Sequence, residues 1–120
     1  MKQLIHDIMN WHLEEFGPTT PKLLKATILK WNEECFELLS AEAYSKQEQE
    51  ELADVFIVGV ALLARMNVRD YRKVVGANHI EWCEKWAECR GVNLEQIVID
   101  KFEIVKGRNQ RERAMQKGEL

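Results

Sequence analysis

Apolar residues recur at helical spacing along most of this sequence, in stretches that glycine, proline or polar segments separate. The first stretch spans about residues 4–16 and stops at Gly17 and Pro18. The second begins after Thr20, because threonine followed by proline is a typical helix start, and its apolar face fades at Glu42. No stretch alternates with a period of two for long enough to predict a strand, so the pattern indicates an all-α fold.

Two more helices follow after a polar turn. Ser45 and Glu48 have the spacing of a capping box, which predicts the start of a third helix over about residues 46–66. A fourth helical pattern covers about residues 80–89, and Gly91 is expected to end it.

The last predicted helix leads into a basic tail. Asn93 is a candidate cap, and the apolar positions after it keep helical period until Gly107. The remaining residues, 108–120, are expected to form a solvated, partly frayed basic tail. At 120 residues the chain is predicted to be a single domain, 1–120, built as a helical bundle of about five helices with a central antiparallel hairpin.

Composition and charge narrow the class of protein. With 46% hydrophobic and 31% charged residues the chain is expected to fold, and a net charge of −3 argues against a surface that grips nucleic acid or anionic lipid as a whole. The longest uncharged stretch, 55–64, is too short to span a membrane. The N-terminus lacks the apolar run of a secretory signal, and the three cysteines have no disulfide or zinc spacing. We therefore expect a cytoplasmic protein.

Candidate chemistry lies first on the second predicted helix. Glu33, Glu34, Glu37 and Lys30 fall within about 100° of arc on one face, away from the apolar stripe. Such a face is by itself most typical of a solvated surface with Glu–Lys pairs.

The third predicted helix changes this interpretation. Between residues 52 and 64 the only ionisable group is Asp54, and Glu51 precedes it by one turn. Burying an unpaired carboxylate is costly, so Asp54 needs a cation, a basic partner or a proton. A divalent ion is the simplest account, because a basic partner from another helix would also have to satisfy Glu51. A hairpin can bring the two acidic sets together, and oxygen ligands without His or Cys suit Mg²⁺ or Mn²⁺.

These residues resemble a known signature. The run from Lys30 to Leu38, with Glu51-Leu52-Ala53-Asp54 after it, is similar to the E-E-x-x-E, spacer, E-x-x-D pattern of the all-α nucleoside triphosphate pyrophosphatases, which include MazG-like proteins and dimeric dUTPases. The likeness covers about residues 28–66. It continues into residues 101–108, similar to a K-x-x-x-N-x-x-R segment, where Val105 replaces the asparagine.

The resemblance implies a fold, an activity and a set of roles. It implies a MazG-like bundle that hydrolyses a nucleoside triphosphate to the monophosphate and pyrophosphate with Mg²⁺, Mn²⁺ being possible as well. It implies that Glu33 positions or deprotonates the attacking water and that Lys30, Lys101 and Arg108 contact the phosphates, with Lys30 counted beside Glu33 as a catalytic residue. The implied metal ligands are Glu34, Glu37, Glu51 and Asp54.

Several questions stay open on the sequence alone. Trp31 lies at the edge of the apolar stripe nearest the acidic face, where it can either pack in the core or stack on a base. The histidines show no zinc spacing and are interpreted as surface or packing residues.

The predicted third helix is apolar on nearly every side, so its residues Phe56, Ile57, Val60 and Leu63 are expected to meet a second subunit in a homodimer or tetramer. Two other functions remain as alternatives to the enzyme. One is a non-catalytic helical dimer that binds a partner through the acidic groove, and the other, nucleic-acid binding through the basic tail, ranks last.

Overall fold

The computed structural model describes residues 1–66, 78–116 and 118. The described residues form α-helices joined by short connections, and they contain no β-strand. This confirms the predicted all-α bundle. The helices are α1 (Lys2–Phe16), α2 (Pro21–Ser40), α3 (Lys46–Arg65), α4 (Asn78–Arg90) and α5 (Leu94–Gln116). In the described residues no helix is long and apolar enough to cross a membrane.

The helix starts follow the caps that the sequence predicts. Thr20 accepts a hydrogen bond from the Leu23 backbone at 3.1 Å, with Pro21 in the first turn. Ser45 and Asn93 do the same for α3 and α5, accepting from backbone N–H groups three residues on, at 3.0 and 3.1 Å. These side chains satisfy N–H groups that have no partner within a helix, and so they fix where each helix begins.

The α2–α3 turn contains one departure from the predicted capping box. Glu48 does not return its hydrogen bond to Ser45 but accepts one from the backbone of Tyr44, at 3.2 Å. Tyr44 takes a positive φ of 66°, a left-handed conformation in the turn. Glu48 is also buried and pairs with Arg90 at 2.7 Å, so this ion pair ties the first turn of α3 to the last turn of α4.

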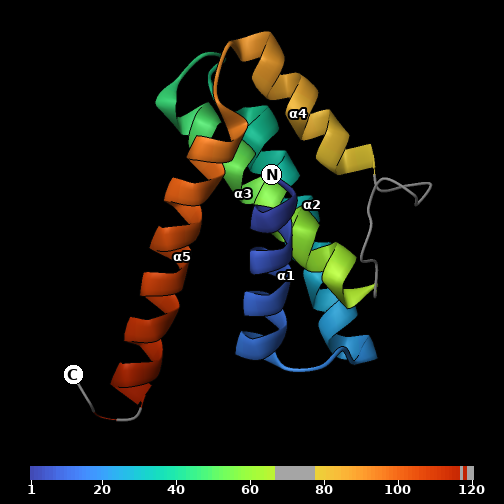
Figure 1. The fold of residues 1–120 in the computed structure, drawn as a ribbon, viewed down its shortest axis with the longest axis vertical. Helices are drawn as coiled ribbons and strands as arrows, with labels where there is room; N and C mark the ends of the chain where they lie inside the picture. Colours follow the sequence, from blue (N-terminus) through green and yellow to red (C-terminus); the bar gives the residue numbers. More distant parts are fainter. Residues whose placement is uncertain (67–77, 117, 119–120) are drawn as a thin grey trace.

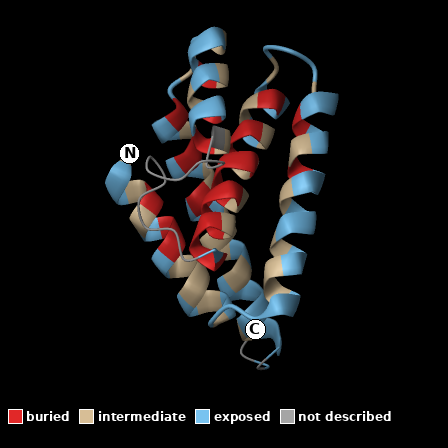
Figure 2. Cartoon of the chain, turned by 90° about the vertical axis from the view of Figure 1, so that its right-hand side faces the viewer, coloured by how far each residue is buried: buried red, intermediate tan, exposed pale blue. Residues whose placement is uncertain are grey.

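Helix α3 is the centre of the bundle, with α1, α2, α4 and α5 packed around it (Figure 1). Buried residues gather on the inner faces of the helices, while the outer faces are exposed (Figure 2). Helix α3 supplies most of the core, including Leu52, Val55, Phe56, Val60 and Leu63. Antiparallel packing of α2 on α3 forms the predicted central hairpin.

The expected subunit surface on α3 is wrong. Phe56 and Val60 are 0% exposed, Leu63 is 2% exposed and Ile57 is 6% exposed within one chain. These four side chains are buried within the single chain, so they are not available to a second subunit.

Helix α5 is longer than the sequence predicts. It continues through Gly107 to Gln116, so the expected frayed tail is helical over residues 108–116. A glycine inside a helix costs about 1 kcal/mol, but the residues beyond it are good helix formers. Arg113 also pairs with Glu15 of α1, at 3.1 Å between Nε and Oε1, and this contact holds the extension against the bundle.

Candidate metal centre

The α2–α3 hairpin brings three of the predicted metal ligands together. Glu34 and Glu37 share a face of α2, and Glu51 lies opposite them in the second turn of α3. One carboxylate oxygen from each residue can be chosen so that all three lie within 4.8 Å of one another. No other group of this kind, with at least three His, Cys, Asp or Glu side chains, occurs in the described residues.

Two oxygens of this triad (Glu34, Glu37 and Glu51) are buried without a partner. Glu34 is only 6% exposed, Glu51 is half-buried and Glu37 is exposed. Glu34 Oε2 and Glu51 Oε2 accept no hydrogen bond from the described residues, although both are removed from solvent. Orphaned carboxylate oxygens are rare and unfavourable, so the triad fits a bound cation.

The close approach of the carboxylates changes their ionisation. Burial, together with the charge of Asp54 and a hydrogen bond with Glu37, raises the pKa of Glu51 to about 7. Burial also raises the pKa of Glu34, although its hydrogen bond with Lys30 opposes the rise. The triad therefore holds a proton near neutral pH, and a cation that binds there must displace it.

Lys30 and Glu33 flank the triad on α2. The Lys30 ammonium lies 3.1 Å from Glu34 Oε1 and 3.6 Å from Glu33 Oε2. The pKa of Lys30 is raised, chiefly by its hydrogen bond with Glu34. The Glu33 side chain is 58% exposed, so it faces the solvent beside the triad and is open to a bound molecule.

Asp54, the fourth predicted ligand, has a basic partner from another helix. Lys101 of α5 places its ammonium 3.5 Å from Asp54 Oδ2, and both side chains are mostly buried. Burial raises the pKa of Asp54, while the charges of Lys101 and, more weakly, Arg108 oppose the rise. Asp54 is thus not one of the three carboxylates that converge, and two of the three predicted phosphate-binding cations, Lys101 and Arg108, interact with it instead.

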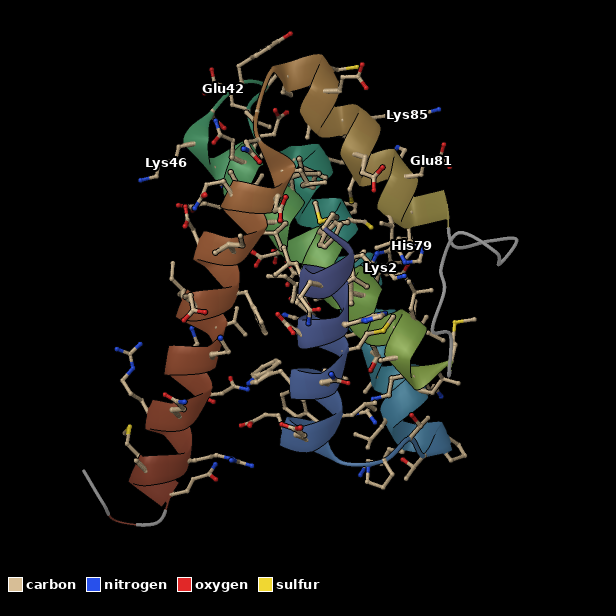
Figure 3. All side chains as sticks on the ribbon, viewed as in Figure 1. Lys2, Glu42, Lys46, His79, Glu81 and Lys85 are labelled. Carbon is tan, nitrogen blue, oxygen red and sulfur yellow. The ribbon has the colours of Figure 1, made fainter. Side chains whose placement is uncertain are left out.

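Trp31 packs against the bundle. Its ring meets His79 edge to face, with 5.5 Å between ring centroids (Figure 3 labels His79 at the start of α4). Both rings lie over Gly59 of α3, where an added Cβ would come within 3.4 Å of Trp31 Nε1. This environment favours the core-packing interpretation of Trp31, although its Nε1 is buried without a partner in the described residues.

An apolar cavity of about 320 Å³ opens beside Lys30, between α1, α2, α3 and α5. It contains a buried arginine that the sequence interpretation did not single out. Arg65 is 4% exposed and donates hydrogen bonds to His12 Nε2 at 3.0 Å and to the Gly17 carbonyl at 2.6 Å. The cavity is lined by Trp11, His12, Phe16, Leu23, Ala26, Thr27, Lys30, Ile57, Val58, Ala61, Arg65, Val105 and Asn109.

His12, in the lining of this cavity, is uncharged at neutral pH. Burial and the neighbouring Arg65 charge lower the pKa of His12 to about 4. Its Nε2 therefore accepts the Arg65 hydrogen bond at neutral pH. The only sequence signal for this pair was that Arg65 is the first cation after the long apolar run of α3.

Comparison with known proteins returns no match. No family model matches the chain, and neither a curated protein nor a solved structure matches it significantly.

Proposed function

We propose that this protein is a nucleoside triphosphate pyrophosphohydrolase that depends on Mg²⁺ or Mn²⁺ and converts a ribo- or deoxyribonucleoside triphosphate to its monophosphate and pyrophosphate. The observation that carries the proposal is the triad of carboxylates, with two buried oxygens that have no hydrogen-bond partner among the described residues. The E-E-x-x-E and E-x-x-D spacing that places these carboxylates resembles that of the all-α pyrophosphatases.

The donor set fits a hard divalent cation. The triad offers only oxygen ligands, which Mg²⁺ and Mn²⁺ prefer, and Asp54 adds a fourth carboxylate once Lys101 turns to another anion. A divalent ion held there supplies positive charge against a polyphosphate and favours the deprotonation of water.

The side chains around the triad supply the remaining chemistry. Glu33 is exposed beside it and accepts the proton of the attacking water. Lys30, Lys101 and Arg108 stabilise the phosphate oxygens and the leaving pyrophosphate, because Lys30 pairs with Glu34, Lys101 pairs with Asp54, and the charge of Arg108 also acts on Asp54. We assign Trp31 to packing of α2 against His79 rather than to contact with the base.

The apolar cavity beside Lys30 is the place for the nucleoside. Its volume of about 320 Å³ lies at the low end of ligand pockets, and its walls are largely apolar. Arg65 and Asn109 offer hydrogen-bond donors within it. Lys30 belongs both to this cavity and to the triad, so a nucleoside in the cavity places its phosphates toward the carboxylates.

The cysteines and the exposed apolar side chains bear on where the protein works and in what assembly. All three cysteines are free, which agrees with a reducing compartment, and we assign the protein to the cytoplasm. We also propose a homodimer or tetramer, since the exposed surface retains large apolar side chains.

The proposal is tested by incubating the protein with Mg²⁺ and a panel of ribo- and deoxyribonucleoside triphosphates, with separate assays for pyrophosphate and orthophosphate. We expect pyrophosphate and the monophosphate as products, and a loss of at least about 100-fold in Glu34→Gln. Glu50→Gln, which removes an exposed charge on α3 outside the triad, is the matched control and should keep activity. Orthophosphate as the only product contradicts the proposed bond cleavage.

The non-catalytic alternative gives a different result. A helical module that uses the acidic groove for a basic partner releases no pyrophosphate with any triphosphate. Its melting temperature also shows no rise with Mg²⁺ that depends on Glu34.

A further inference from the structure

Helix α2 exposes a row of large apolar side chains on the face away from α3. Ile28 is 41% exposed, Leu29 is 60%, Leu39 is 69% and Phe36 is 73%. At 100° per residue these four positions fall within about 100° of arc, so they share one face of the helix, with the exposed Asn32 between the two pairs; this face is named here the α2 stripe. A face of this kind on an otherwise polar surface is typical of a protein–protein contact.

The charges of α2 are divided between its two ends. Lys22, Lys25 and Lys30 lie in the first half of the helix. Every acidic residue of the helix lies in the second half, with Glu42 in the turn beyond it. The first turn of α2 contains no acidic residue and the last turn no basic residue.

This arrangement opposes the helix dipole, which favours acidic side chains at the N-terminus and basic ones at the C-terminus. Neither Lys22 nor Lys25 forms an ion pair with a described residue, and both are exposed. Lys30 pairs with Glu33 and Glu34 across the middle of the helix, whereas the two lysines nearer its start have no such partner among the described residues.

The apolar stripe and the division of charge along α2 are both symmetric about the same point in the sequence. Ile28 and Leu39, the ends of the stripe, are equally far along the chain from the point between Glu33 and Glu34. Lys25 and Glu42 are equally far from that same point. A two-fold axis through it pairs an apolar residue with an apolar residue and a lysine with a glutamate, which is the self-complementarity that a symmetric dimer requires.

We propose that a second copy of this chain packs antiparallel on the α2 stripe, about a two-fold axis between Glu33 and Glu34, with Lys25 of each copy beside the partner's Glu42. Leu29 and Phe36 form the apolar centre of the contact. Glu42 lies in the turn that joins α2 to α3, at the end of the hairpin, where a neighbouring lysine can reach it (Figure 3). The dimer does not depend on whether the triad binds a metal.

The dimer has a consequence for the candidate metal centre. Leu29 lies one helical turn before Glu33, so the stripe borders the acidic face of α2. At 100° per residue Lys30 and Glu37 project about 130–150° away from the centre of the stripe, so the second copy covers the stripe and leaves the open side of the triad accessible.

The test is the molar mass of the full chain in solution, measured by light scattering and sedimentation over a range of concentrations. We expect twice the chain mass of 14.1 kDa. Phe36→Ser should raise the dimer dissociation constant at least about 10-fold, since buried aromatic anchors dominate such contacts. Ile104→Ser, which removes an apolar side chain with 52% exposure on α5, is the matched control and should leave the constant unchanged.

A charge exchange tests the antiparallel register. Lys25→Glu and Glu42→Lys should each weaken the dimer several-fold, and the double variant should return to within about two-fold of the original constant. If Phe36→Ser shows no helical circular dichroism and therefore has not folded, the variants at these two surface positions still test the contact. A monomer at all concentrations, a dimer indifferent to the stripe, or a double variant no better than the singles overturns the proposal. A mixed complex with another protein in place of the dimer overturns it as well.

Discussion

The substitution Glu51→Gln is expected to raise the stability of the metal-free protein while it weakens the binding of a metal ion by the triad. In the metal-free protein the Glu51 pKa is raised from 4.5 to about 7, so its ionised form is unfavourable in the folded state. Below pH 4.5 the group is protonated whether the chain is folded or not, and above pH 7 it is ionised in both. Glu51 therefore contributes a loss of stability as the pH rises from about 4.5 through 7, opposite in sign to the contribution of His12, and a rise of this size in pKa corresponds to about 3 kcal/mol.

Replacing the carboxyl group with an amide removes that cost. We expect the variant to be more stable than the original protein by about 2–3 kcal/mol at pH 8 with a chelator present, and nearly equal to it at pH 4.5. Urea unfolding at the two pH values measures the difference from the transition midpoints. The three carboxylates titrate as a coupled group, so the pH dependence belongs to the triad as a whole.

Divalent metal should reverse the order of the two proteins. An ion present at about 100 times its dissociation constant stabilises the original protein by about 2.7 kcal/mol and has a much smaller effect on Glu51→Gln. Glu50→Gln is the control, because it removes a charge from the exposed neighbouring position. The reasoning is refuted if Glu51→Gln is less stable than the original protein at pH 8, or if its advantage is the same at both pH values.

Three further predictions concern contacts near the triad. Lys101→Met should lower the free energy of unfolding by about 2 kcal/mol, because it leaves Asp54 without its partner, and adding Asp54→Asn should recover most of the loss in urea unfolding. His12, whose pKa is lowered to about 4, should make stability fall by about 3 kcal/mol as the pH drops from 6.5 to 4, and His12→Gln should flatten that profile; parallel profiles contradict the assignment. Gly59→Ala should cost about 1–3 kcal/mol in thermal unfolding, because its Cβ would lie 2.7 Å from His79 Cδ2, and an unchanged melting temperature contradicts this clash.

Features that depend on neighbouring residues were predictable from the sequence. Thr20, Ser45 and Asn93 cap the helices they were expected to cap, because an N-cap bond joins residues only three apart. Gly91 ends α4 as predicted, with φ of 69° and backbone hydrogen bonds back into the last turn. The convergence of three carboxylates could also be predicted from the sequence, because helical spacing fixes which residues share a helix face and a short turn makes α2 and α3 a hairpin. The three residues are Glu34, Glu37 and Glu51.

Contacts between distant helices were not predictable in this way. The periodicity of α5 does not say which residue of α3 it meets, so the Lys101–Asp54 pair was not foreseen and a metal ion was invoked for Asp54 instead. The apolar surface of α3 was assigned to a second subunit because the sequence pattern shows that this surface must be buried. The pattern does not show which helices bury it. The buried pair of Arg65 and His12 joins residues 53 positions apart, beyond any local rule.

The buried ion pair between Glu48 and Arg90 makes the geometry of the carboxylate triad depend on a helix that supplies none of its oxygens. Glu48 lies one turn before Glu51, and Arg90 fixes it from the end of α4 while its guanidinium lies over the Tyr44 ring, 4.6 Å from the centroid. Variation in α4 can therefore change how strongly a cation is held while every coordinating side chain is left intact. A search for inactivating substitutions that is confined to the acidic residues would overlook this class.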